Sequence, residues 1–287
     1  MPQTINSNPV SLNAQRNLNS SQASLATAMQ RLSSGLRVNS AKDDAAGLAI
    51  AERMNSQVRG MTVAVRNAND GISLAQTAEG ALGKVGDMLQ RMRELAVQAV
   101  NSTNSEGDRA SLNNEYLQLA RESARTLGGT QFNSQNILAT SVASRFQVGA
   151  NTTAALDQIS VAGFNWTSVA TITSAIGAAV GTDPAINVSG TDGSFATAAI
   201  TALDAAITAV NDGRATFGAV QNRFDNVVAN LMVNVENQTA ARSRIMDADY
   251  AMETASLSRA QILQQAGNAM LAQANQLPQQ VLALLQR

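Results

Sequence analysis

The stretch that decides the fold of this chain is residues 256–285, SLSRAQILQQAGNAMLAQANQLPQQVLALL. Its apolar residues recur at alternating spacings of three and four, which is the pattern of a helix that packs along another helix. This seam comprises Ala260, Leu263, Gly267, Met270, Ala274, Leu277, Val281 and Leu284. The opposite face carries glutamine and asparagine and almost no charge, whereas a solvated helix face normally carries Glu, Lys and Arg. We therefore predict that this helix lies in a crowded site where amides meet neighbouring groups.

A lone helix of this kind is not expected to be stable, because ordering thirty residues costs more conformational entropy than its few large apolar side chains recover. Its expected partner is at the other end of the chain. Leu18, Leu25 and Leu32 are spaced seven residues apart there, with no charge between Arg16 and Arg31. Two unrelated surface helices would instead leave uncharged faces in water. We therefore predict that the two chain ends pair with each other.

The composition excludes several classes of protein. Of 287 residues, 14% are charged and 3% aromatic, and the net charge is −1, so the chain lacks the basic surface that nucleic acids need. There is no cysteine and no histidine, which removes disulfides, the commonest metal ligand and the commonest general base. We expect no enzyme activity, cofactor or metal site. No apolar run approaches membrane-spanning length, and residues 1–10 lack a signal-peptide pattern, so export is expected by another route.

The interior of the chain also reads as mainly helical. A capping box at Ser40–Asp43 begins a long helix with two apolar stripes that runs to Val100. After a turn, Ser105 and Asp108 cap a third helix that ends at Gly128-Gly129. The period then changes from helical to alternating at residues 146–148 and again at 159–161, which predicts a β-hairpin with a turn at 149–153. Helical spacing resumes near residue 195.

The predicted fold class is mainly α, with long antiparallel coiled-coil helices from both chain ends forming a rod and a small β-hairpin region in the middle of the sequence. We predict two domains. The terminal coiled-coil domain comprises residues 1–40 and 245–287. The rod domain comprises residues 41–244, with long helices at 41–128 and 195–244 and a hairpin and irregular region at 130–194.

Several stretches resemble a known family. Residues 12–18 (LNAQRNL), 31–37 (RLSSGLR), 39–50 (NSAKDDAAGLAI) and 132–138 (FNSQNIL) are similar to the N-terminal region of bacterial flagellin. Residues 218–224 (GAVQNRF), 243–245 (SRI) with 247–250 (DADY), and 260–267 (AQILQQAG) resemble its C-terminal region. Pro9 and Gln286 depart from the family's usual pattern. The large outer domains of longer flagellins are missing, so the chain resembles a core-only form.

The resemblance implies an extracellular structural subunit of the flagellar filament. Such a subunit is exported unfolded by the flagellar type III system and polymerises with itself beneath a filament cap, and hook-associated proteins are further partners. The terminal helices would line the inner tube, so the assembly residues are Leu18, Leu25, Leu32, Leu263, Met270, Leu277 and Leu284. The hairpin would belong to the region that switches filament supercoil. A dedicated export chaperone would contact Leu263, Met270 and Leu277.

A second role follows from the same resemblance. Residues 90–98 (QRMRELAVQ) are similar to the segment that Toll-like receptor 5 grips in flagellin monomers, and the matching positions are Arg91, Leu95 and Gln98, with Glu115 on the third helix. These residues are also expected to contact other subunits in the filament.

Two alternatives remain open from the sequence. The acidic groupings Asp43-Asp44, Asp247 with Asp249, and Glu94 are the only candidates for catalysis, and helix capping explains the first of them. A hook-filament junction protein shares the terminal helices of flagellin but differs in its inner domain. The motifs at 90–98 and 132–138 favour flagellin over that alternative.

Overall fold

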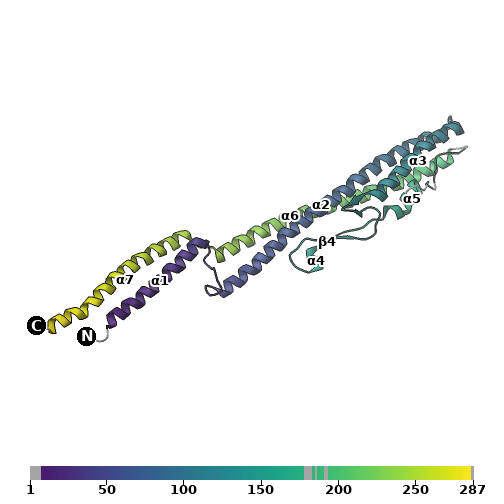
Figure 1. Ribbon diagram of the computed structural model, residues 1–287. Helices are drawn as coiled ribbons and strands as arrows, with labels where there is room; N and C mark the ends of the chain where they lie inside the picture. Colours follow the sequence, from purple (N-terminus) through teal and green to yellow (C-terminus); the bar gives the residue numbers. More distant parts are fainter. Residues whose placement is uncertain (1–7, 178–182, 185, 191–192, 286–287) are drawn as a thin grey trace. The chain divides into compact units, whose positions relative to one another are not determined.

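The structure is a computed structural model that describes residues 8–177, 183–184, 186–190 and 193–285, with the side chains of 277–285 excepted. Long helices dominate this described part (Figure 1). The helices are α1 (Pro9–Ser34), α2 (Ala45–Val100), α3 (Glu106–Gly129), α4 (Ala154–Asp157), α5 (Ala170–Ile176), α6 (Ser194–Met246) and α7 (Tyr250–Leu285), with a 3-10 turn at Trp166–Ser168. The strands are β1 (Gln131–Phe132), β2 (Gln135–Asn136), β3 (Ser144–Gln147) and β4 (Gln158–Val161). The mainly α prediction is confirmed.

The chain divides into two compact units. Unit 1 comprises Met1–Gln57 and Glu236–Arg287, and unit 2 comprises Val58–Val235. The terminal unit is therefore larger than the expected domain of residues 1–40 and 245–287. The reason is a small core in which Val38, Ala51 and Met246 are buried together, so the start of α2 and the end of α6 belong to the terminal unit.

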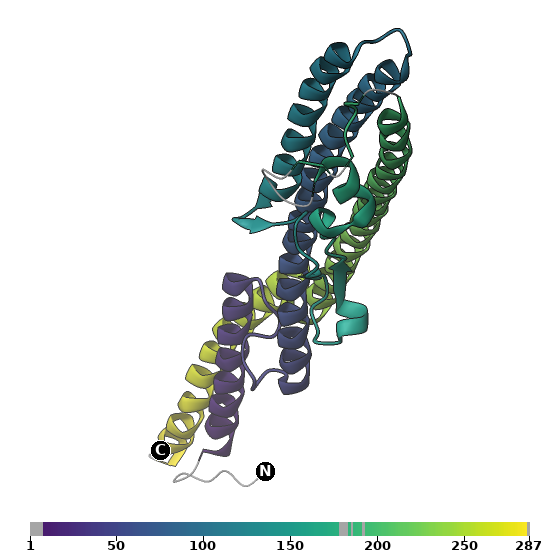
Figure 2. The same cartoon turned by 90° about the vertical axis from the view of Figure 1, so that its right-hand side faces the viewer.

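In unit 1, α1 and α7 lie side by side and antiparallel (Figures 1 and 2). Asn8 Nδ2 near one end of the pair donates to the carbonyl of Ala274 at 2.8 Å, and Arg31 at the other end forms an ion pair with Glu253 at 3.0 Å. The predicted pairing of the two chain ends is confirmed.

Proline does not delay the start of α1. The helix begins at Pro9, because the first helical position needs no backbone N–H, and Asn8 caps it by accepting from Ser11 N at 3.1 Å. At its other end α1 stops at Gly35, which adopts φ +71°, and the Gly35 N–H bonds Arg31 O at 2.8 Å.

Of the two capping boxes predicted from the sequence, only the one at the start of α3 caps its helix as expected. The predicted capping box at residues 40–43 forms only in part. Asp43 accepts hydrogen bonds from the backbone N–H and the hydroxyl of Ser40, which lower the pKa of Asp43, but the Asp43 N–H donates to the Ser40 carbonyl at 3.0 Å. That prediction was also wrong about the cap, because α2 starts at Ala45 and its cap is Asp44, which accepts from Gly47 N at 2.7 Å. The capping box of α3 at Ser105 and Asp108 is confirmed.

Unit 2 is built on α2, α3 and α6, whose facing residues form one continuous core. Its largest fully buried side chains include Leu82, Leu89, Met92, Tyr116, Leu127, Phe217 and Phe224. Residues 137–176 complete this core from one side. Tyr116, for example, donates its hydroxyl to Ala175 O at 3.2 Å, and burial raises the pKa of that hydroxyl well above its ordinary value.

Two small antiparallel sheets lie in the middle of the sequence. The predicted hairpin is confirmed as β3 paired with β4, in register Phe146 opposite Ile159. The second pair, β1 with β2, turns through Asn133 and Ser134, both with positive φ. The region before α6, expected to be irregular or short-stranded, contains a 3-10 turn and α5 within its described residues.

One helix qualifies as a membrane span by length and composition, contrary to the expectation from sequence. An 18-residue window of α6 reaches a mean hydropathy of 1.2. Leu203, Val210, Phe217 and Phe224 of this helix are buried in the core of unit 2, so these four apolar side chains have partners within the unit.

Glycine allows an aromatic ring to approach α6 closely. A Cβ built on Gly213 would clash with the Trp166 ring, whereas one built on Gly218 in the same helix would meet nothing within 4 Å. The tryptophan, which is the only one in the chain, therefore packs where the helix lacks a side chain.

We predict opposite effects for the two glycines. Gly213→Ala should lower the free energy of unfolding by about 1–3 kcal/mol through overpacking, while Gly218→Ala should raise it by up to about 1 kcal/mol through helix propensity. Urea denaturation followed by Trp166 fluorescence measures both values. Equal effects at the two positions would contradict the close Trp166 packing.

Candidate assembly interface

The contact between α1 and α7 is made largely by small residues. Ala28 of α1 and Ala260 and Ala274 of α7 are buried, and a Cβ built on Gly267 would lie 3.2 Å from Leu18 Cδ1. Small side chains at these positions let the two backbones approach closely. Leu18, Leu25 and Leu32 are half-buried along the same contact, as their seven-residue spacing predicts.

The structure corrects two positions of the predicted α7 seam. Leu263 and Met270 are 52% and 62% exposed, and the half-buried positions beside Ala260, Gly267 and Ala274 are instead those of Leu257, Gln264 and Leu271. The heptad pattern allows either set, because both alternate three and four residues with the shared small positions. Leu277 and Leu284 have side chains outside the described residues, so their assignment stays a prediction.

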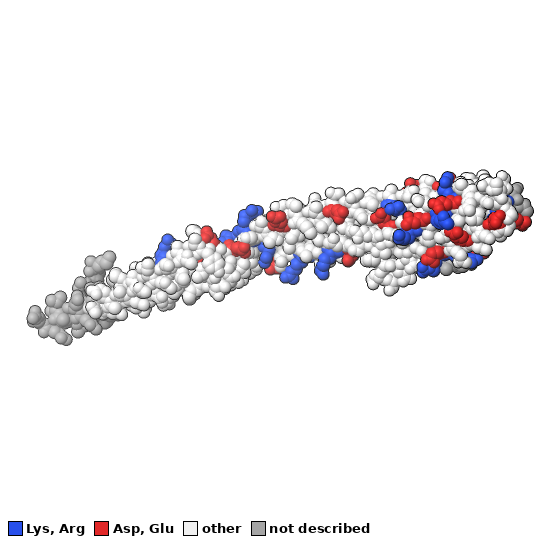
Figure 3. Space-filling model, turned by 90° about the horizontal axis from the view of Figure 1, so that it is seen from above, with Lys and Arg blue, Asp and Glu red and all other residues white. Residues whose placement is uncertain are grey.

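The exposed positions are not scattered. Leu263 and Met270 line a groove of about 990 Å³ between α1 and α7, together with Val10, Leu18, Ser21 and Gly267 among others. Further large apolar side chains of this pair are exposed at Leu12, Met29 and Ile262. Figure 3 shows almost no charge on the face of the pair that it displays. Isolated apolar residues are common on surfaces, but a groove of them on an uncharged helix pair indicates a contact surface.

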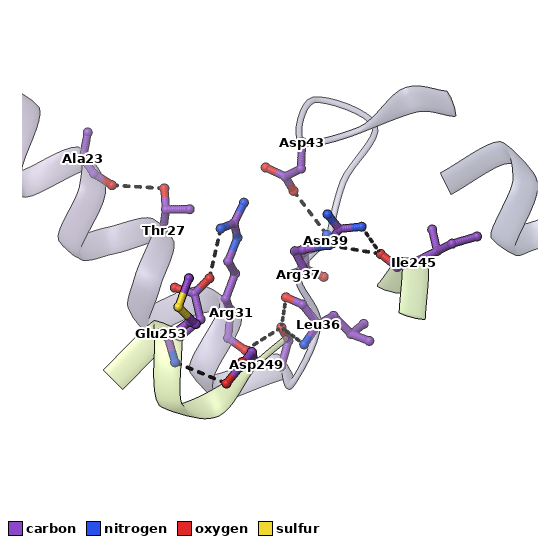
Figure 4. A network of polar contacts seen from close by, with 12 residues as sticks. Ala23, Thr27, Arg31, Leu36, Arg37, Asn39, Asp43, Ile245, Asp249 and Glu253 are labelled. Carbon is purple, nitrogen blue, oxygen red and sulfur yellow. Dashed lines mark hydrogen bonds and ion pairs between the residues drawn. The ribbon is translucent and has the colours of Figure 1, made fainter. Parts of the chain in front are cut away.

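Charges gather instead where α1 ends and α7 begins (Figure 4). The ion pair of Arg31 with Glu253 has side chains 31% and 13% exposed, and among the described residues of unit 1 it is the only ion pair. Arg37 donates through Nη2 to the carbonyl of Ile245 at 2.7 Å, and Tyr250 donates its hydroxyl to Leu32 O at 3.1 Å. The ion pair and the Tyr250 bond fix the register of α1 against α7 at this end of the pair, whereas the Arg37 bond joins the connector after α1 to the end of α6.

The positions matched to the receptor lie on α2 and α3 in unit 2. Arg91 Nη2 and Glu115 Oε1 form an ion pair at 2.9 Å on the surface, and Arg91 also pairs with Glu94. Hydrogen bonds donated to Glu94 and to Glu115 raise the pKa of the Arg91 guanidinium. Gln98 is exposed. The prediction for Leu95 as a receptor contact is corrected. Its side chain is 2% exposed and packs in the core, so it does not lie on this surface.

No group of three or more His, Cys, Asp or Glu side chains that could hold a metal ion occurs within the described residues. The acidic pairs considered from the sequence act locally. Asp249 caps α7 by accepting from Ala251 N at 2.9 Å, and Asp247 accepts from the hydroxyl of Ser243 at 2.6 Å.

Comparison with known proteins agrees with this arrangement. The model of the bacterial flagellin N-terminal helical region matches residues 5–143, and that of the C-terminal helical region matches residues 200–285. These matches cover most of the chain, including both halves of the α1 and α7 pair. The chain belongs to the bacterial flagellin family. As a flagellin, it is a structural protein of the extracellular flagellar filament.

Relatives of similar length support a short form without large outer domains. A flagellin of Halalkalibacterium halodurans is 48% identical, with 98% of this chain and 99% of that protein covered. The flagellar filament 33 kDa core protein of Treponema phagedenis is 42% identical, with 98% and 99% covered. The crystal structure of Bacillus cereus flagellin matches with a TM-score of 0.49 and 35% identity over 58% of this chain and 88% of that one.

We predict that Arg31→Ala loosens the α1 and α7 pair, because it leaves the poorly exposed Glu253 carboxylate unpaired. A loss of about 1 kcal/mol makes amide hydrogen exchange in the first turns of α7 about fivefold faster. The matched control is Lys84→Ala, whose ion pair with Asp87 has both side chains more than 70% exposed and should contribute little. Unchanged exchange in α7 of the Arg31→Ala variant would show that the ion pair does not hold the two helices.

Proposed function

We propose that this flagellin builds the filament by completing the burial of unit 1 against neighbouring copies. The observation that carries the proposal is the exposed apolar groove between α1 and α7, lined by Leu263 and Met270. A helix pair with almost no charged side chains is poorly suited to permanent exposure to water. Covering it with the same surface of other subunits would remove several large apolar side chains from water at about 25 cal/mol per Å². The role is structural and not catalytic.

The terminal helices would form the inner tube of the filament and line its channel. Amide and hydroxyl side chains such as Asn13, Asn17 and Ser24, which border the groove, can hydrogen-bond to neighbours without the cost of burying an unpaired charge. A channel wall with few charges would also not bind an exported subunit electrostatically as that subunit passes through the channel.

Export, on this proposal, uses the flagellar type III system with the chain unfolded. A dedicated chaperone would cover the exposed face of α7 until export, and Leu263, Met270 and Leu277 remain its candidate contacts. The filament cap and the hook-associated proteins would be the partners at the two ends of the polymer. Each of these partners follows from membership of the family and not from a contact within this chain.

A direct test is electron microscopy of the purified chain mixed with short filament seeds. Leu263→Gln with Met270→Gln should abolish growth, because the polar side chains no longer bury favourably, while the thermal unfolding of unit 2 stays unchanged. The conservative pair Leu263→Met with Met270→Leu should grow normally, because the apolar volume is kept.

A chain lacking residues 256–287 should fail to grow as well. Normal hollow filaments from the Gln variant or from the truncated chain would overturn this role of the groove. Failure of the full-length chain to extend any seed would favour a junction or capping role, the alternative of a hook-associated protein.

Recognition by Toll-like receptor 5 is a second proposed role, for the monomer. The exposed Arg91, paired with Glu115 across α2 and α3, gives a fixed charged site with polar neighbours such as Gln98. A guanidinium held by two carboxylates is well ordered and keeps donors for a partner. Leu95 would act only by packing beneath this surface.

We expect monomer to activate a receptor reporter, and Arg91→Ala to weaken activation by tenfold or more, since interface arginines often dominate binding. Arg125→Ala is the matched control, because Arg125 forms a similarly exposed ion pair with Glu122 on α3. No response to the monomer, or equal responses from both variants, would end this proposal.

A further inference from the structure

We propose that the loop after β3 inserts the Leu156 side chain of one subunit into a recess at the start of β3 on a second copy. This inference rests on the proposed filament function. It assigns a contact within unit 2, away from the apolar groove of unit 1. The loop and the recess are both present in every copy of the protein, so two copies can form the contact without another protein.

The loop presents an apolar side chain without support from its own subunit. Leu156 is 82% exposed, the highest value among the large hydrophobic residues that are exposed in the described chain. It lies on α4, a single turn between β3 and β4. The adjacent residues Ala154 and Ala155 are small, so Leu156 stands out from its surroundings as a knob.

The loop is held in shape by its own hydrogen bonds. Asp157 accepts through its carboxylate from Thr153 N at 3.1 Å, and its carbonyl accepts from Val148 N at 2.7 Å. Gln147 Nε2 donates to Gly149 O at 3.0 Å and to Asn151 O at 2.7 Å. A preorganised loop loses less conformational entropy on docking than a flexible one. Leu156 is therefore presented in a fixed position.

The complementary surface lies at the other end of the same strand. A recess of about 1050 Å³ is lined by Leu74 of α2, Phe132 of β1 and Phe146 of β3, among others. Val142 also lines it and is 72% exposed. The docked Leu156 would cover Val142, so two of the most exposed apolar side chains of the chain would shield each other from water.

The charged groups around the two surfaces are also complementary. The recess contains Asp70 and Arg145, and neither is in an ion pair with another described residue. Beside the loop, Gly60 of α2 lies against Ala150, and the neighbouring Arg59 is exposed and unpaired among the described residues. Arg59 of one copy can thus face Asp70 of the next, while Arg145 has donors for the backbone carbonyls of the inserted turn.

The two surfaces differ from each other, so the contact is heterologous and repeats from copy to copy. Along α2 the loop lies at Gly60 and the recess at Leu74, a separation of about 21 Å at 1.5 Å per residue. Each step therefore shifts the next copy along the α2 axis. One turn in one recess buries far less than the roughly 1,200 Å² of a stable dimer, so the contact forms where other filament contacts hold the copies.

The absence of cysteine from the chain makes this contact directly testable by disulfide trapping. The double variant Leu156→Cys with Val142→Cys is grown from seeds, oxidised and run on a non-reducing gel. We expect a ladder of covalent multimers from filaments and none from monomer. Each single variant should give no cross-link. Leu156→Cys with Val63→Cys is the matched control, because Val63 is also exposed on unit 2 but lies outside the recess.

The possible failures are distinguishable. Filaments of the double variant that form no ladder, or dimers from Leu156→Cys alone, would overturn this contact and leave the filament function intact. If the native chain forms no filaments, the filament function and this contact fall together. If only the Val142→Cys variant fails to assemble, Ala143→Cys replaces it, because Ala143 lines the same recess.

A second measurement does not depend on cross-linking. Leu156→Asp should raise the critical concentration for growth at least tenfold, with an unchanged monomer melting temperature, because Leu156 makes little contact within its own subunit. The conservative variant Leu156→Met should keep the critical concentration of the native chain. An unchanged critical concentration for Leu156→Asp would overturn the proposal.

Discussion

The antiparallel contact between α1 and α7 is the constraint on which the rest of unit 1 depends. Small residues at Ala28, Ala260, Gly267 and Ala274 let the backbones approach closely, but they bury little apolar surface. Close packing therefore comes with an incomplete core, and large apolar side chains remain on the outer face of the pair. In a monomer that exposure is unfavourable, whereas in the assembly that we propose the same side chains would contribute free energy of association.

Unit 2, in contrast to unit 1, buries most of its large apolar side chains within one subunit. Its three long helices and the segment at 137–176 bury their large side chains within one subunit, with Tyr116, Phe217 and Phe224 at the centre. This unit therefore has a continuous core of its own. The contacts that we propose for this unit use small local features, namely the Arg91 and Glu115 pair and the Leu156 loop. On the proposed function, the subunit combines a unit with a continuous core and a unit whose apolar groove would be covered on assembly.

Polar bonds, and not the small apolar residues of the seam, set the register of α1 against α7. A seam of alanine and glycine slides easily, because one small residue replaces another at little cost. The ion pair of Arg31 with Glu253 and the bond from Asn8 to Ala274 lie near opposite ends of the α1 and α7 pair. Directional bonds of this kind contribute little to total stability but distinguish one register from its alternatives.

The sequence by itself determined the mainly α fold, the pairing of the chain ends, the β3–β4 hairpin and the family, because heptad spacing, alternation and motif order are local patterns in the chain. Only the tertiary structure decided which heptad positions face α1. The spacing of Leu257 and Leu271 fits the seam as well as that of Leu263 and Met270, and the packed helix pair leaves the first two half-buried and the other two exposed. It likewise decided that Leu95 is buried and Leu156 is exposed, because burial depends on which distant segments cover a residue, and no local pattern records that.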